Sequence, residues 1–244
     1  MGDHPDNYPP TPTEPVRREV MRMWWLDLSF IHWRWDAAVV QSLLPPGLTV
    51  DTFDGDAWVG LVPFLMKVGL PGGVAIPQQG TFPETNVRTY VRGPDGTPGV
   101  WFCSLEAGRL AASATARLTY GLPYFWADMR MANAGPIWTY QSTRRWPEPG
   151  PRHSSAVQVG DAIGLGDQTP LERFLTARWG LFSLWRERLL YAPVDHPAWE
   201  LHRAELLSLD DELVAAAGLP APSSEPIVHW TPGVEVRIGR PRRA

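Results

Sequence analysis

One segment near the middle of the chain, Phe82–Gly93 (FPETNVRTYVRG), constrains the fold more than any other. Successive side chains of an extended strand point to opposite faces, so Glu84, Asn86, Arg88 and Tyr90 would share one face. The opposite face carries threonine and valine residues, which favour strands and suit packing against another layer. The segment therefore predicts a strand with one polar face and one face buried in a core.

Further strand-like runs flank this segment and are separated by turn residues. Gly99–Gly108 follows a turn and is expected to pair antiparallel with Phe82–Gly93 as a hairpin. The dipeptide Asp54-Gly55 readily supplies positive φ angles and predicts a second hairpin. The other strand-like runs are Met21–Trp33, Tyr124–Met131, Gly135–Trp146, Ser154–Ile163, Leu189–Ala192, Glu200–Leu207 and Pro226–Gly239, the last with a turn expected at Pro232-Gly233.

A few short helices are expected between these strands. Asp36 can cap a helix that continues to Leu44, and Arg109–Tyr120 is rich in alanine and leucine. Thr169–Glu187 has helical spacing, with Thr169 as the cap and a proline at the first helical position, and Asp210–Gly218 resembles a short capped helix. Many short strands without βαβ alternation predict a mainly β (α+β) fold, an antiparallel sheet curled into a barrel or an open cone.

The length of 244 residues suits one hydrophobic core. The first 17 residues include many prolines and aspartates, so residues 1–17 are expected to form a disordered lead-in. Residues 18–238 are expected to form the single barrel domain, and residues 239–244 a basic tail.

Composition excludes several classes of function. The net charge is −4, and the sequence has no basic block outside its last few residues, so nucleic-acid binding is not expected. No apolar run approaches the roughly 20 residues that cross a bilayer, and no membrane association is expected. A single cysteine, Cys103, permits no intrachain disulfide and suits a reducing, cytoplasmic location.

Metal and nucleotide sites are not expected either. His196 and His202 lie six positions apart across a proline, which is not the spacing of a helical zinc site. The glycine-rich run 160–166 lacks the spacing and the βαβ context of a phosphate-binding loop. We therefore expect neither a metal nor a cofactor.

Several segments in a fixed order resemble a known family. They are HWRWDAAVVQSLLPPGLTVDTFDGDAWVGLVPF, FPETNVRTYV, GVWFCSLEA, YGLPYFWADM, APVDHPAWEL and VHWTPGVEV, which together span His32 to Val236. This pattern is similar to the YqjF-like proteins, a family of unknown function in the acetoacetate decarboxylase-like superfamily. The resemblance implies a closed, cone-like antiparallel β-barrel with a small-molecule cavity. Superfamily relatives often assemble, so the resemblance also suggests a homo-oligomer.

The same resemblance argues against one reaction mechanism. The decarboxylases form a Schiff base on a lysine that follows a proline in a segment similar to Tyr120–Pro123. Here the next residues are Tyr124 and Phe125, and neither side chain can condense with a ketone. The only lysine, Lys67, lies beside a glycine-rich loop and is expected to point to solvent. Schiff-base chemistry is therefore not expected.

If the polar face of Phe82–Gly93 lines the cavity, Arg88 can bind a carboxylate while Glu84, Asn86 and Tyr90 orient it. The alternative is an ordinary solvent-facing strand. A guanidinium that points inward should be paired, because an unpaired buried charge is costly. We expect its partner to be Glu84 or Glu106.

Two further side chains are candidates for proton transfer. Tyr124 can donate a proton or a hydrogen bond to a ligand oxygen, or it can be a buried core aromatic. His229 can be a base near neutral pH or a structural histidine. Three functions stay open. The first is non-covalent acid/base catalysis of the lyase, cyclase or isomerase type on a carboxylate or carbonyl compound, with Glu106 or Glu84 balancing charge. The second is a non-catalytic ligand-binding or sensing domain, and the third is a protein-interaction module that uses exposed aromatic residues.

Overall fold

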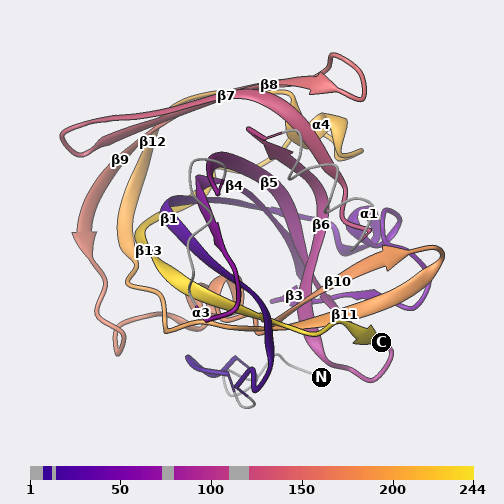
Figure 1. The fold of residues 1–244 in the computed structure, drawn as a ribbon. Coiled ribbons are helices and arrows are strands. Elements are labelled where there is room, and N and C mark those ends of the chain that lie inside the picture. The colour runs from indigo at the N-terminus through magenta and orange to yellow at the C-terminus, as the bar shows by residue number, and fades with distance from the viewer. Residues whose placement is uncertain (1–7, 13–14, 73–79, 110–120) are drawn as a thin grey trace.

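A computed structural model describes residues 8–12, 15–72, 80–109 and 121–244, and strands predominate in it (Figure 1). The described helices are α1 (Ala37–Gln41), α3 (Pro170–Thr176) and α4 (Leu213–Ala216). The strands are β1 (Glu19–Trp35), β2 (Thr49–Val50), β3 (Thr52–Phe53), β4 (Asp56–Gly69), β5 (Thr81–Arg92), β6 (Pro98–Ala107), β7 (Tyr124–Ala134), β8 (Ile137–Trp146), β9 (Arg152–Ala162), β10 (Gly180–Trp185), β11 (Arg188–Asp195), β12 (His202–Asp211), β13 (Ile227–Gly239) and β14 (Arg242–Arg243).

The sheet closes on itself by two routes, which share strands β13, β1, β4, β5 and β6. In the inner circuit β10 and β11 join β6 to β13. In the outer circuit β7, β8, β9 and β12 join the same two strands, which gives a closed barrel of nine strands. Figure 1 shows β7 and β8 arching over the top of the molecule, with β10 and β11 at the lower right. The predicted closed, mainly β barrel is confirmed, although β6 pairs in parallel with β7 and with β10.

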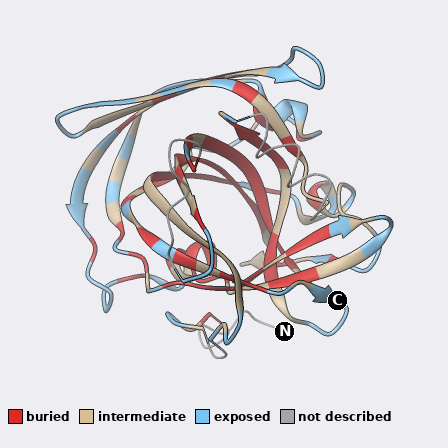
Figure 2. Cartoon of the chain, in the orientation of Figure 1, coloured by how far each residue is buried: buried red, intermediate tan, exposed pale blue. Residues whose placement is uncertain are grey.

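Strand β5 has the alternation that its sequence predicts. It pairs antiparallel with β4 on one edge and with β6 on the other, and Asn86 lies opposite Val62 and Leu105. Both faces of the strand are buried, so the polar face does not meet bulk water. Figure 2 shows this burial as red along the central strands, whereas the ends of β7, β8 and β9 are pale blue. Residues Glu84, Asn86 and Arg88 consequently face the space inside the inner circuit.

Two apolar clusters occupy the two circuits. Within the inner circuit, Leu28 and Phe30 of β1 pack with Phe64 of β4. On the opposite face of the shared strands, Ile31 and Val87 pack against β8, β9 and α4, which contribute Tyr140, Val157 and Leu213. The shared strands therefore carry core side chains on both faces.

Two expected elements differ in the structure. Helix α3 begins at the predicted cap, Thr169, which forms a capping box with Glu172. The helix ends at Thr176, and strand β10 occupies residues 180–185 of the expected helix. The expected turn at Pro232-Gly233 is wrong, because β13 runs unbroken through both residues. The helix expected over Arg109–Tyr120 falls almost entirely outside the described residues. The Asp54-Gly55 turn between β3 and β4 is confirmed, with φ of 53° and 87°.

Both ends of the expected domain extend further than the sequence suggested. Tyr8 is 2% exposed, and its hydroxyl donates a hydrogen bond to Asp51 at 2.9 Å. The indole of Trp179 donates to the Pro9 carbonyl at 3.1 Å. Arg242 and Arg243 form β14 against β11. Residues 8–12 and this part of the basic tail thus pack on the folded unit, in contrast to the expected lead-in and tail.

Candidate functional site

A cavity lies inside the inner circuit, against the polar face of β5. The volume of this cavity is about 80 Å³. An apolar cavity of about 150 Å³ can hold benzene, so this space suits a ligand of a few non-hydrogen atoms. Most of the wall is apolar, and its polar side chains are few. The lining residues are Met21, Met23, Trp25, Leu28, Val62, Phe64, Met66, Glu84, Asn86, Arg88, Phe102, Leu105, Leu122, Tyr124, Leu181, Ser183, Ala192, Ile238 and Pro241.

Glu84 and Tyr124 form a hydrogen-bonded pair in this wall. The Tyr124 hydroxyl donates to Glu84 Oε2 at 3.1 Å, and Glu84 is only 2% exposed. Burial raises the pKa of Glu84 to about 8, against which the Tyr124 hydrogen bond is a smaller opposing effect. Burial also raises the pKa of Tyr124 well above its usual value. Glu84 is therefore mostly a neutral carboxylic acid at pH 7, and Tyr124 is a neutral phenol.

Arg88 lines the same cavity without an acidic partner. Its side chain is 7% exposed, and Nη2 makes a long hydrogen bond of 3.5 Å to the Leu175 carbonyl. The guanidinium lies 5.2 Å from the centroid of the Phe30 ring. Within the described part of the chain, its Nε has no acceptor and no carboxylate forms an ion pair with it. Asn86 lies between Arg88 and Glu84 on this face, and no described residue donates a hydrogen bond to its buried Oδ1.

The expected pairing of Arg88 with Glu84 or Glu106 is wrong for two physical reasons. Glu84 is held neutral by burial and bonds Tyr124. Glu106 lies opposite Thr85 in the register of β5 and β6, on the face that points away from the cavity. There it is fully buried and forms an ion pair with Arg144. A buried guanidinium with no internal counter-charge is a place where a ligand anion would be favoured.

Tyr90 does not line the cavity, although its ring centroid lies 5.8 Å from the guanidinium carbon of Arg88. Its hydroxyl donates to the Leu175 carbonyl at 2.6 Å, the same oxygen that Arg88 contacts. A phenol has a single proton, so His32 must donate from Nε2 to the Tyr90 oxygen, which lies 2.6 Å away. Burial lowers the pKa of His32 well below its usual value, which keeps the ring neutral. The sequence could not place His32, which is fully buried in this chain of contacts.

Two other predicted groups lie elsewhere. His229 Nε2 is 3.0 Å from Oε1 of Glu172 on α3, and His229 does not line the cavity. Lys67 of β4 lies opposite Trp24 of β1 in the register of the two strands, and its ammonium is 4.8 Å from the Trp24 ring centroid. Its neighbour Met66 lines the cavity, so the alternation of the strand directs Lys67 to the other face.

Strand β1 contributes lining residues that we did not expect from the sequence. Met21, Met23 and Trp25 alternate with residues on the other face, which is the signal that could have identified them. The parity then changes, because Asp27 has a left-handed φ of 49° and Leu28 becomes the next lining residue. An irregularity of this kind cannot be read from an apolar run of mixed aromatics and methionines.

Within the described ranges, no three His, Cys, Asp or Glu side chains come together as a metal ion would require. Burial raises the pKa of the Cys103 thiol to about 12, so it is not a reactive thiolate at neutral pH. None of the described helices has both the length and the apolar character needed to cross a bilayer.

Known proteins resemble this chain in sequence and in fold. The uncharacterized protein YqjF of Bacillus subtilis (strain 168) is 34% identical over 215 residues, covering 86% of this chain and 87% of that protein. The enduracididine biosynthesis enzyme MppR, in a complex with pyruvate, matches with a TM-score of 0.65 at 15% identity, over 93% of this chain and 91% of that one. Acetoacetate decarboxylase from Legionella pneumophila matches with a TM-score of 0.60 at 14% identity, over 97% and 89%.

The two structural matches establish the acetoacetate decarboxylase-like fold, and at this level of identity they establish only the fold. The family model described as "Uncharacterized conserved protein", DUF2071, matches residues 22–235. This match covers most of the chain and agrees with the relationship to YqjF. The chain therefore belongs to the DUF2071 family.

Proposed function

We propose that this protein binds a small carboxylate- or carbonyl-bearing molecule in the cavity and acts on it by non-covalent acid/base catalysis. The observation that carries the proposal is the buried Arg88 guanidinium, which faces the cavity without a carboxylate partner among the described residues. The presence of pyruvate in a complex of the structurally similar MppR supports a small keto acid as the ligand class.

The polar groups of the proposed site differ in charge and in task. Arg88 supplies a permanent positive charge for the ligand carboxylate, and Asn86 can orient a ligand donor through its free Oδ1. Glu84 lies four positions earlier on the same face of β5 and is neutral at pH 7. The ligand would therefore have its anionic end at Arg88 and a carbonyl or hydroxyl end toward Glu84 and Tyr124.

A neutral carboxylic acid in an apolar wall can act as a general acid. Glu84 would give its proton to the ligand carbonyl oxygen, and the resulting carboxylate would take a proton from the adjacent carbon. This sequence converts the keto form to the enol and regenerates the acid, as a lyase, cyclase or isomerase step requires. Lys67 lies on the other face of β4, so no imine is part of the proposal.

The binding half of the proposal is tested with pyruvate and a panel of small carboxylates. We expect these to raise the melting temperature of the wild type, and a ligand at 100 times its Kd stabilises by about 2.7 kcal/mol. The Arg88→Gln variant should lose the shift. Arg130→Gln is the matched control, because Arg130 is exposed on β7 and lies outside the cavity lining. Equal shifts in the two variants would remove Arg88 from the site.

The catalytic half is tested by hydrogen–deuterium exchange at the carbon next to the carbonyl of each keto acid that binds, followed by NMR in D2O. Glu84→Gln should bind but exchange about 10²- to 10⁴-fold more slowly, which is the usual contribution of a general acid or base. Binding without exchange in the wild type would reject catalysis and leave the non-catalytic ligand-binding domain as the function.

A further inference from the structure

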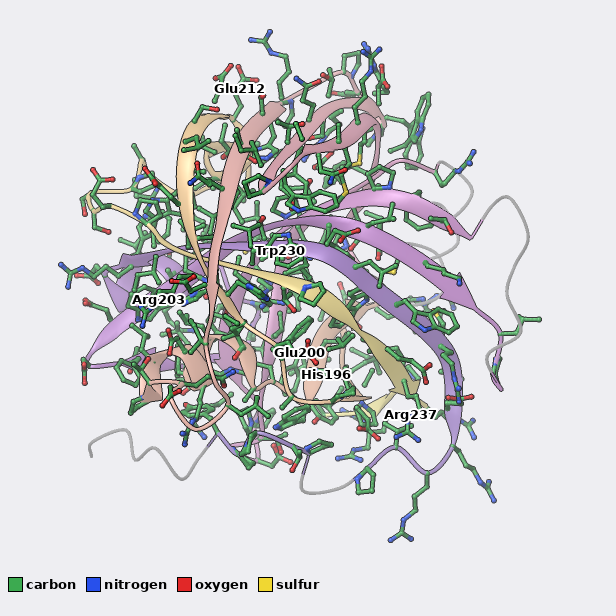
Figure 3. The ribbon with its side chains drawn as sticks, turned by 90° about the vertical axis from the view of Figure 1, so that its left-hand side faces the viewer. His196, Glu200, Arg203, Glu212, Trp230 and Arg237 are labelled. Carbon is green, nitrogen blue, oxygen red and sulfur yellow. The ribbon has the colours of Figure 1, made fainter. Side chains whose placement is uncertain are left out.

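A second, smaller chamber lies beside the main cavity and shares Arg88, Trp25, Phe102 and Leu181 with it. The volume of this chamber is about 20 Å³, which is enough for one particle the size of a water molecule. Its other lining residues are Val100, Thr176, Arg178, Gly180, Val194, His196 and Trp199, of which His196 is labelled in Figure 3. The proposed function makes no use of this chamber.

Two buried arginines line the chamber, and one of them has no carboxylate partner among the described residues. Arg88 and Arg178 are 7% and 5% exposed. Arg178 Nη1 lies 2.6 Å from Asp51 Oδ2, but Asp51 also pairs with Arg92 at 2.8 Å. One carboxylate thus serves two arginines. Asp195, the buried carboxylate next to His196, pairs with Arg237 at 2.9 Å, and Arg88 has no carboxylate partner among the described residues. A buried guanidinium without a counter-charge is costly unless an anion compensates it.

Among the described residues that line the chamber, the buried side-chain groups without a hydrogen-bond partner are all donors. Arg88 Nε, Arg178 Nη2 and Trp25 Nε1 are buried and have no acceptor within the described structure. One water molecule can accept two hydrogen bonds and brings two protons that need acceptors of their own. A monatomic anion can accept from all three donors and brings no proton.

His196 does not supply the missing negative charge. Its Nδ1 lies 2.7 Å from the Pro197 carbonyl, so this nitrogen carries a proton. Burial lowers the pKa of His196 to about 4, and the nearby Arg88 contributes in the same direction. The ring is therefore neutral at pH 7 and adds no charge to the chamber.

We propose that this chamber binds a monovalent anion of halide size between Arg88 and Arg178. The proposal rests on the inward orientation of Arg88 that the proposed function also uses, but it concerns a different ligand and a different space. The bound anion compensates the charge of the arginines and accepts the free N–H groups. It does not require turnover or any ligand in the main cavity.

Bromide tests this proposal directly on the wild-type protein. Crystals grown in sodium bromide should show an anomalous scattering peak in the chamber, within hydrogen-bonding distance of Arg88 and Arg178. Crystals grown in sodium nitrate of the same ionic strength are the control and should show none. Bromide confined to the main cavity or the surface, or a chamber filled only by water at molar bromide, would overturn the proposal.

Two filling substitutions separate this site from the main cavity. Val100 lines the chamber but not the main cavity, and Val62 lines the main cavity but not the chamber. Replacing sodium gluconate with sodium chloride at constant ionic strength should raise the melting temperature by about 5 °C at 100 times the Kd, in the wild type and in Val62→Met. The rise should disappear in Val100→Met.

The same two variants make the two proposals independently falsifiable. Val62→Met should lose the stabilisation by small carboxylates, and Val100→Met should retain it. Loss of the chloride effect in Val62→Met but not in Val100→Met would reject the chamber as the anion site. If Val100→Met fails to fold, the anomalous bromide map of the wild type decides the question. Failure of every carboxylate to bind would reject the proposed function and leave the halide result standing.

Discussion

Glu84 is the residue whose ionisation should be visible in the stability of the protein. Its pKa rises from the ordinary value of 4.5 to about 8 on folding, because burial disfavours the carboxylate. Between these values the folded state binds more protons than the unfolded state, so its contribution to stability falls as the pH rises. It is fully present below about pH 4.5 and lost by about pH 8.

The Glu84→Gln variant lacks this titration and keeps a neutral side chain of similar size. Between pH 5 and pH 8, we expect the free energy of unfolding of the variant to increase relative to that of the wild type by a few kcal/mol. A pKa shift of one unit corresponds to about 1.4 kcal/mol. Urea denaturation at intervals of half a pH unit measures the difference. A difference that stays constant over this range would show that Glu84 keeps an ordinary pKa in the folded protein.

At the same scale, the sequence predicted which residues share a face but not which groups meet. Period-two alternation was sufficient to place Glu84, Asn86 and Arg88 together, because it depends only on the local strand. The position of Glu106 depends on the register between β5 and β6, which shifts between Val87 and Arg88. Contacts such as that of His229 with Glu172 join residues 57 positions apart and cannot be derived from local pattern.

Among the elements, β13 depends on Gly233, for which the sequence pattern predicted a turn. Gly233 has a φ of 112°, and a Cβ atom there would lie 2.0 Å from the Trp25 carbonyl oxygen of β1. Alanine is therefore excluded by both backbone conformation and space, and Gly233→Ala should destabilise the protein by more than about 3 kcal/mol.

Gly55 provides the matched control for this substitution. Its φ is 87°, but nothing lies within 4 Å of its Cβ position. Gly55→Ala should thus show only the backbone penalty of about 1–2 kcal/mol. Urea denaturation of both variants compares the two costs. Equal losses would mean that β1 and β13 do not approach each other as closely as the register indicates.

Local composition also explains which elements were predicted correctly. Asp54-Gly55 forms its turn because both residues adopt positive φ and the flanking strands pair at once. Pro232-Gly233 has the composition of a turn, yet β13 continues because β1 pairs with β13 along the whole length of β13. Strand β1 is itself irregular near Asp27, opposite these two residues. Helix α3 was expected to extend to Glu187, but residues 180–185 pair with β11 and β6. In both errors long-range strand pairing overrode a local preference.

On the scale of the whole molecule, the two circuits should differ in local stability. The shared strand β5 is buried on both faces along most of its length, whereas β8 has several exposed and half-buried residues. Opening β5 would expose both apolar clusters, while opening β8 would expose one. Native-state hydrogen exchange read by mass spectrometry should therefore give at least 10-fold greater protection for peptides of β4 and β5 than for peptides of β8 and β9. The β6 peptides provide an internal reference, because β6 belongs to both circuits and should behave like β5. Uniform protection over all of these strands would mean that the barrel opens only as one cooperative unit, and the distinction between the circuits would then have no energetic meaning.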